Sequence, residues 1–332
     1  MQTIRMMPEW DCWPLWWEGG ENVGNIDPST LPLSDSLIQA LAEWADRFDE
    51  TYNRADPAAS GFKSNDASLQ FDKIGKQLWW QLQTELTGNY QVTYWDIKNS
   101  VQLEPNQWLF TKAPFAVLLE TAVGSPFMLD NSALADLDLN PIDIKNARDD
   151  LVQARHVDGA IVSPLLAQLL LTMLTPGYKC ITQLRSQQSR WVQVALHPGA
   201  DGIVGEALNH DETRLLASLE DMNEALAWLL THIPAKSKDT ESSSPQLLEA
   251  LLPQVQTAVT MLILNFTQET DTAETAVMWF ITDTGIWLSD NQVDEGYAIP
   301  VTKEALHTRL YNIIKSTMPD QALSPRADKH LK

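Results

Sequence analysis

Two stretches in the second half of the chain share one order of predicted elements, and this order restricts the fold more than any other feature. Residues 160–234 and 245–319 each read as a helix, three short strands and a second helix that ends at a proline. Short strands joined by turns such as Asp283-Thr284-Gly285 pair antiparallel. The pattern predicts an α+β fold over residues 105–320, with antiparallel sheets, packed helices and an internal quasi-two-fold repeat. The predicted strands lie near residues 178–184, 191–196, 203–208, 276–282, 286–289 and 297–301.

Residues 1–100 differ in composition from the rest of the chain, because they hold eight of its 13 tryptophans. Ser34 is a predicted N-cap, and the residues after it place Leu37, Leu41 and Trp44 on one face of a helix. Strands are predicted on either side of this helical region, the second with the alternating pattern of residues 90–94. We therefore expect a small α/β module at residues 1–100, the α+β domain at 105–320 and a disordered tail at 321–332.

The charge of the chain limits its partners. There are 44 acidic and 23 basic residues, which gives a formal net charge of −21. Such a field repels nucleic acids and anionic membranes and attracts basic proteins. The two cysteines are too few for a disulfide framework, and no apolar run reaches the roughly 20 residues needed to span a bilayer. The sequence predicts a cytoplasmic protein that binds neither nucleic acid nor membrane.

The densest cluster of potential ligands and acid–base groups is His210-Asp211-Glu212, and His197 is the nearest other histidine. One interpretation is a hydrolase site in which His197, His210 and nearby carboxylates converge in the fold. The other is that Asp211 and Glu212 lie at or before the start of a helix, where carboxylates are stabilised. The second is favoured because the chain has no nucleotide-binding, zinc-protease or serine-hydrolase motif. We expect no cofactor, no metal and no enzymatic activity.

The tryptophan-rich segment Trp10–Trp17 has both a structural and a functional interpretation. Most tryptophans are expected in the core, but large rigid aromatic side chains are also the usual anchors of protein interfaces. Neighbouring residues of a strand face opposite ways, so at most one of Trp16 and Trp17 is easily buried there. The predicted partner-binding residues are three tryptophans and three acidic residues of the first helix: Trp13, Trp16, Trp17, Glu43, Asp46 and Glu50.

Two resemblances to known families cover most of the chain. The segments Pro8–Trp16, Val23–Pro28, Leu31–Ser34 and Ser60–Phe62 resemble small bacterial immunity-type proteins encoded beside polymorphic toxins. This resemblance covers about the first 95 residues and implies no catalytic residue. The remainder resembles the EspG-type chaperones of type VII (ESX) secretion in the short segments Gly124–Pro126, Leu169–Pro176, Met278-Trp279 and Asp283–Gly285. That family implies an antiparallel sheet with helices and internal quasi-two-fold symmetry.

Together these observations predict a non-enzymatic protein that binds another protein. The resemblances imply a chaperone or immunity partner of a secreted or toxic protein, and the charge implies that this partner is basic. A hydrolase with a site around His197 and His210 is the alternative. The two differ in a structural feature, because an enzyme needs convergent titratable groups in a pocket, whereas a binder presents an aromatic and charged surface.

Overall fold

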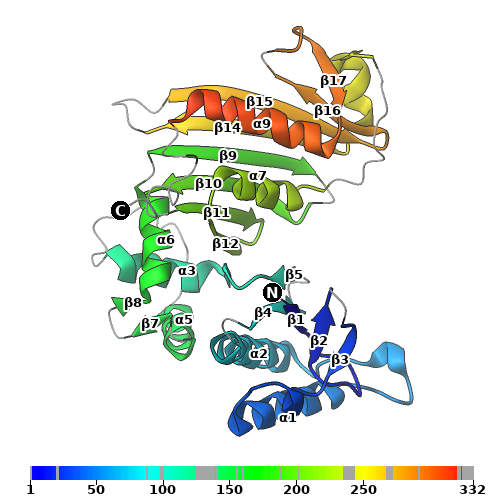
Figure 1. Cartoon of the computed structure of the whole chain (residues 1–332), viewed down its shortest axis with the longest axis vertical. Helices are drawn as coiled ribbons and strands as arrows, with labels where there is room; N and C mark the ends of the chain where they lie inside the picture. The colour runs from blue at the N-terminus through cyan, green and yellow to red at the C-terminus, as the bar shows by residue number, and fades with distance from the viewer. Residues whose placement is uncertain are drawn as a thin grey trace. The chain divides into compact units, whose positions relative to one another are not determined.

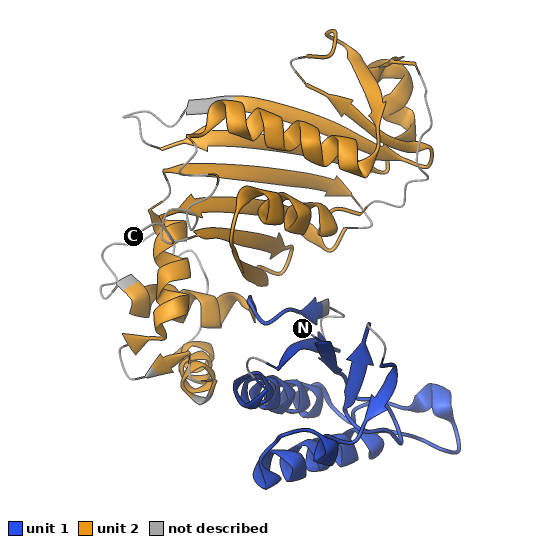
Figure 2. Ribbon diagram, viewed as in Figure 1, with its two compact units in different colours: residues 1–107 blue, residues 108–332 orange. Residues whose placement is uncertain are grey.

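The computed structural model describes residues 2–319 and 323, apart from 20–21, 87–88, 98–100, 124–138, 140, 155, 159–160, 176, 187–188, 201, 235–243, 267–271 and 291. The chain forms two compact units, residues 1–107 (unit 1) and residues 108–332 (unit 2), which are coloured separately in Figure 2. Apart from Leu323, the tail that was predicted to be disordered lies outside the described residues.

Unit 1 is a five-stranded sheet with two long helices (Figure 1). The strand order is β3-β2-β1-β4-β5, in which β1 and β4 are parallel and the other neighbours are antiparallel. A parallel pair needs a crossover, which the helices between β3 and β4 provide. The elements are β1 (Gln2–Met6), β2 (Leu15–Glu18), β3 (Gly24–Ile26), α1 (Asp35–Asp49), α2 (Asn65–Glu85), β4 (Tyr90–Asp96) and β5 (Val101–Leu103), with 3₁₀ turns at Pro28–Thr30 and Pro57–Ala59.

The core of unit 1 is built on buried tryptophans whose ring N–H groups are satisfied. Trp44 of α1 is fully buried and donates to the carbonyl of Phe71 at 3.0 Å. Gly75 lets α2 approach this ring, because a Cβ there would lie 2.7 Å from Trp44. The predicted cap is confirmed, since the Ser34 side chain accepts a hydrogen bond from Leu37 N. Trp44, Leu37 and the other inward residues of α1 therefore lie where the sequence pattern placed them.

Unit 2 is built on a ten-stranded sheet whose order is β13-β17-β16-β15-β14-β9-β10-β11-β12-β6. A separate two-stranded ladder joins β7 and β8. The strands are β6 (Gln107–Phe110), β7 (Val157–Asp158), β8 (Ile161–Val162), β9 (Tyr178–Ser186), β10 (Trp191–Gly199), β11 (Gly202–Asn209), β12 (Arg214–Leu219), β13 (Gln246–Leu247), β14 (Thr257–Asn265), β15 (Thr272–Thr282), β16 (Gly285–Ser289) and β17 (Tyr297–Val301). The helices are α3 (Lys112–Val123), α5 (Pro141–Gln153), α6 (Pro164–Leu174), α7 (Met222–Thr231), α8 (Leu248–Leu251) and α9 (Lys303–Thr317), with a 3₁₀ turn at Leu252–Gln254.

The large sheet consists of two antiparallel meanders that meet at their first strands. Strands β9 to β12 follow one another outward on one side, and β14 to β17 do so on the other, with β9 and β14 paired antiparallel at the centre. Each meander has four strands, so the prediction of three was wrong: it omitted β12 and β14. The predicted correspondence therefore set β9, a central strand, against β15, which is one strand further out. That the two predicted repeats, residues 160–234 and 245–319, superpose on each other stays a prediction.

Helices α7 and α9 lie side by side on one face of this sheet (Figure 1), where His307 Nε2 of α9 is 3.2 Å from the carbonyl of Asn223 in α7. Alternate residues of the central strands are buried on one side, as in Val259, Met261 and Ile263 of β14. The helix predicted from Pro245 is wrong in extent, because the chain there makes a short strand before the four-residue α8. The described residues nevertheless have the predicted α+β class, with antiparallel-rich sheets and packed helices.

Candidate functional site

Strand β2 sends the two adjacent tryptophans to opposite faces of the unit 1 sheet. Trp17 is in register with Ile4, whose side chain is fully buried on the face that α2 covers. Trp16 therefore points to the other face, where its ring N–H donates to the carbonyl of Met7 at 3.0 Å. Both rings are half-buried. The two tryptophans thus lie on opposite faces of the sheet, as expected for neighbours in a strand, and neither ring is fully exposed.

Trp13 is the most exposed of the predicted tryptophans, at 43%. Its backbone is fixed although its ring is not covered: Trp13 N donates to Asn25 Oδ1 at 2.9 Å, and Asn25 Nδ2 donates to the carbonyl of Trp13 at 2.6 Å. A large ring on an ordered backbone loses little conformational entropy when a partner covers it. This geometry suits a binding anchor.

Trp10, which the sequence prediction omitted, joins the tryptophan-rich segment to the end of α1. Its ring stacks on Phe48 and Tyr52, with centroid distances of 5.6 and 4.9 Å. Its ring N–H also donates to Thr51 Oγ1 at 3.1 Å. Phe48 and Tyr52 are four residues apart, which is a helical spacing, but no pattern in the sequence points from them to a residue 38 positions earlier.

The three predicted acidic residues, Glu43, Asp46 and Glu50, are exposed and lie on one side of α1 at spacings of three and four. The tryptophan-rich segment extends this surface, because Asp11 N donates to Asp49 Oδ1 at 2.9 Å. Trp13 lies at most about 7 Å along the chain from Asp11. We call the surface formed by Trp10–Trp13, Glu43, Asp46, Asp49 and Glu50 the α1 edge.

The negative potential of the α1 edge affects the pKa of the Cys12 thiol. Partial burial raises its pKa, and the charges of Glu9, Asp49 and Asp11 raise it further. Each of these carboxylates disfavours a thiolate beside it. The α1 edge therefore combines exposed aromatic surface with carboxylates, which is the chemistry predicted for contact with a basic protein.

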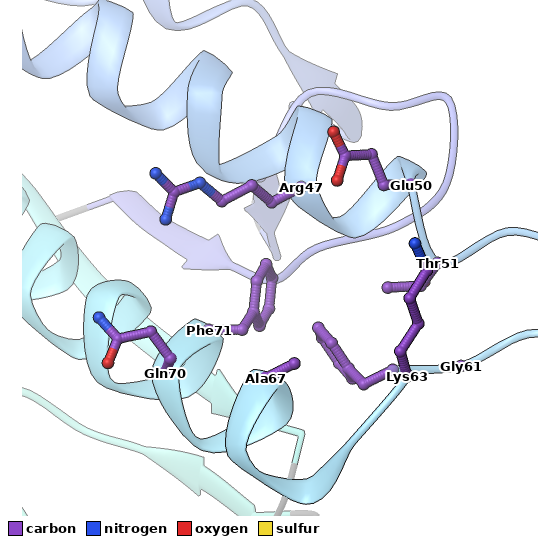
Figure 3. Close-up of a pocket in the computed structure, with 9 residues that line it drawn as sticks. Arg47, Glu50, Thr51, Gly61, Lys63, Ala67, Gln70 and Phe71 are labelled. Carbon is purple, nitrogen blue, oxygen red and sulfur yellow. The ribbon is translucent and has the colours of Figure 1, made fainter.

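A pocket of about 260 Å³ opens where α1 ends and α2 begins (Figure 3). Arg47 and Glu50 reach it from α1, and Ala67, Gln70 and Phe71 reach it from α2. The loop between the helices closes it, since Gly61 N donates to the carbonyl of Thr51 at 3.0 Å. The lining residues are Arg47, Glu50, Thr51, Gly61, Phe62, Lys63, Ala67, Gln70 and Phe71. Of these, only Glu50 was predicted, because the pocket depends on contacts between distant segments.

The histidines of the alternative hydrolase site do not converge. His197 is buried in β10, opposite Val204, whereas His210 is exposed beyond the far end of β11. Six residues of strand separate them, which is about 20 Å at 3.3 Å per residue. His197 Nε2 instead lies 3.1 Å from Glu206 Oε2, and burial lowers the pKa of His197. This pair lies within the sheet and lacks the access that a substrate needs.

Asp211 and Glu212 were predicted at or before the start of a helix, and this prediction was wrong. They form a turn between β11 and β12, in which Asp211 Oδ1 accepts a hydrogen bond from Thr213 N and Glu212 has a left-handed backbone with φ of 62°. Glu212 pairs with Lys112 at 3.0 Å. Among the described residues, no group of three or more histidine, cysteine, aspartate or glutamate side chains is placed to hold a metal ion.

Residues 2–97 match the family model described as Serratia CdiI immunity protein-like. The whole α1 edge and the pocket lie within these residues. No curated protein shows significant sequence similarity to the chain.

A solved structure similar to part of the chain is that of the Mycobacterium tuberculosis type VII secretion system chaperone EspG5 in complex with the PE25–PPE41 dimer. The TM-score is 0.46 at 11% sequence identity, and the match covers 64% of this chain and 97% of that chain. Similarity at this level assigns no function to unit 2. In the described part of unit 2 and of unit 1, every helix is too short or too polar to cross a membrane.

Proposed function

We propose that the chain is a non-enzymatic protein-binding protein, and that unit 1 acts as an immunity-type module that binds a toxin through the α1 edge. The observation that carries the proposal is the match of residues 2–97 to an immunity protein-like family. This segment contains both an exposed tryptophan on a fixed backbone and an exposed row of carboxylates. Tryptophan is enriched at binding hot spots, and polar groups usually form the rim around them.

The proposed partner presents a basic surface. Glu43, Asp46 and Glu50 have no ion-pair partner within the part of the chain that the structure describes, so they are free to pair with lysines or arginines of another protein. Charges of this kind steer encounter and fix orientation more than they add affinity. Trp13 supplies the anchor in this proposal. Trp16 and Trp17 are half-buried, so each would contribute a smaller contact area at the margin of the binding surface.

The proposal extends to the cellular role only in part. A toxin inhibitor of this kind acts where the toxin acts, which we take to be the cytoplasm. A chaperone role for residues 105–320 and a connection to type VII secretion stay predictions, since they depend on the resemblance alone. The proposed role of unit 1 does not depend on them.

The test is binding of the full chain to candidate toxins encoded by the genes next to its own. We expect a stable complex. Replacing Trp13 with alanine should weaken it by about 2 kcal/mol, roughly 30-fold, because an exposed anchor is lost. The stability of the free chain should change little.

A second variant tests the carboxylates. The triple change Glu43→Gln, Asp46→Asn and Glu50→Gln should weaken the complex about 10-fold, since exposed ion pairs contribute up to roughly 1 kcal/mol each. The matched control is Glu249→Gln, Asp294→Asn and Glu295→Gln, which removes the same charge from exposed positions of unit 2. If no complex forms, or if the control weakens it as much as the α1 variant, the proposed binding surface is wrong.

A further inference from the structure

We propose that the pocket between α1 and α2 binds one apolar side chain of the partner protein, and that this side chain lies next to a carboxylate. The inference rests on the proposed function, because it specifies what the α1 edge recognises. Its test below uses peptides, so that it can fail while the proposed function stands.

The size and floor of the pocket indicate a single side chain as the occupant. Its volume of about 260 Å³ is below the roughly 300–1,000 Å³ of small-molecule sites. The rings of Phe62 and Phe71, whose centroids are 5.0 Å apart, line the pocket. Ala67 also lines it, and its small side chain leaves room beside the rings. An aromatic ring or a leucine would bury apolar surface against these rings, which is the main source of affinity at such sites.

The walls of the pocket are already fixed in the free protein. Phe71 stacks on the buried ring of Trp44 at 4.6 Å, and its carbonyl accepts the Trp44 ring N–H. On the loop side, Gly61 has φ of 155° and is hydrogen-bonded to Thr51. A site that needs no reordering spends less free energy on binding. The pocket is therefore suited to an anchor residue.

The charge of the pocket rim is opposite in sign to that of the surrounding α1 edge. Arg47 and Lys63 are both exposed at the rim, and neither has an ion-pair partner within the described residues. Glu50 is the acidic residue of the lining, so the rim is net positive beside the negative α1 edge. A carboxylate next to the anchor can pair with Arg47 or Lys63, whereas a lysine or arginine at the same place would face both cations, with Glu50 as the acidic residue of the lining. The partner would thus place basic residues on the α1 edge and an acidic–apolar pair at the pocket.

The probe is the capped dipeptide N-acetyl-Asp-Phe-amide, and N-acetyl-Lys-Phe-amide is its charge-reversed comparison. Binding to the full chain would be measured by saturation-transfer NMR on the phenylalanine ring protons. We expect the aspartate peptide to bind with a Kd in the millimolar range and the lysine peptide to bind at least fivefold more weakly. Failure of both peptides to bind, or equal binding of the two, would overturn the inference.

Matched variants locate the binding. Ala67→Trp fills the pocket and should abolish the signal, whereas Gln81→Trp places the same side chain at an exposed position of α2 about 21 Å along the helix and should leave it unchanged. Lys63→Gln should weaken the aspartate peptide severalfold, and Gln81→Glu, with the same change in net charge, should not. Unchanged binding by the Ala67→Trp variant contradicts the inference. The toxin complex can still form in that case, which would leave the proposed function intact.

Discussion

The core of unit 1 holds a lysine between two aspartates, whereas the core of unit 2 holds histidines. Lys76 lies 2.8 Å from both Asp72 and Asp96, and Tyr94 donates to Asp72 at 3.0 Å. All six histidines of the chain follow residue 108. Burial lowers the pKa of those at 156, 197 and 232. Unit 2 also pairs buried carboxylates with arginines, as in Asp290 with Arg309. The difference is that only unit 2 buries histidines, whose protonation opposes folding, so pH should affect the two units differently.

The largest effect is expected from Lys76→Met. Asp96 is completely buried, so removal of the lysine leaves its carboxylate without that ion pair. Breaking a buried ion pair from one side destabilises a protein by about 3–5 kcal/mol. Urea unfolding of the full chain, followed region by region with hydrogen exchange, should show this loss in unit 1 only. The double variant Lys76→Met with Asp96→Asn should recover part of the loss, and no recovery would contradict the role given to Asp96.

Acid is expected to act on unit 2 first. Burial lowers the pKa of His156 to about 4, while the unfolded chain binds the proton near its ordinary value of about 6.5. Stability is therefore lost as the pH falls from about 6.5 towards 4, by about 2 kcal/mol at pH 5 from this residue alone. His197 and His232 shift in the same direction.

Unit 1 supplies the internal control for this pH effect. Although burial raises the pKa of Glu18, its hydrogen bonds with Arg5 and Thr93 lower it overall, so the stability it contributes is lost only below its ordinary pKa of 4.5. Burial raises the pKa of Glu104, which does not favour acid unfolding. Hydrogen exchange at pH 7 and pH 5, corrected for intrinsic rates, should show lost protection in unit 2 and a smaller change in His156→Gln. Earlier loss in unit 1 would reverse the comparison.

The smallest of these effects concerns the tryptophan rings. Trp44 of unit 1 donates its ring N–H to Phe71, but the ring N–H of Trp279 in unit 2 is buried with no hydrogen-bond partner among the described residues. Both changes to phenylalanine remove similar volume. Only Trp44→Phe loses a hydrogen bond, so it should cost about 1 kcal/mol more. Chemical denaturation of the two variants measures the difference, and equal losses would show that packing alone decides.

The sequence predicted best what depends on local patterns. Ser34 caps α1 and the inward residues of that helix are buried, because capping and helical spacing are properties of neighbouring residues. Strand β14 was missed although it lies at the centre of the large sheet. Its run Thr257–Asn265 is apolar on both faces, and such a run does not distinguish a buried strand from a buried helix.

The candidate site was predictable only in its exposed part. The carboxylates of α1 follow from its spacing, and Trp13 follows from the composition of its segment. The pocket unites α1, the loop at residues 51–64 and α2, and Trp10, from another segment, donates a hydrogen bond to Thr51 of its lining. No short pattern encodes contacts of this range, because they exist only once the helices have packed. The distance between His197 and His210 could not be predicted for the same reason, because it depends on the register of the strands.

The association rate between the full chain and the toxin that it binds, measured from low to high salt, tests the central claim most directly. Steering by exposed carboxylates is screened over about 8–10 Å at physiological ionic strength. We predict an on-rate that falls at least tenfold between 0.02 and 0.5 M salt as an order-of-magnitude effect of steering, roughly the lower end of its known range. The Glu43, Asp46 and Glu50 triple variant should show a much flatter dependence, and the unit 2 control triple should match the wild type. An on-rate that does not change with salt, or a triple variant with the wild-type slope, would contradict binding through the α1 edge.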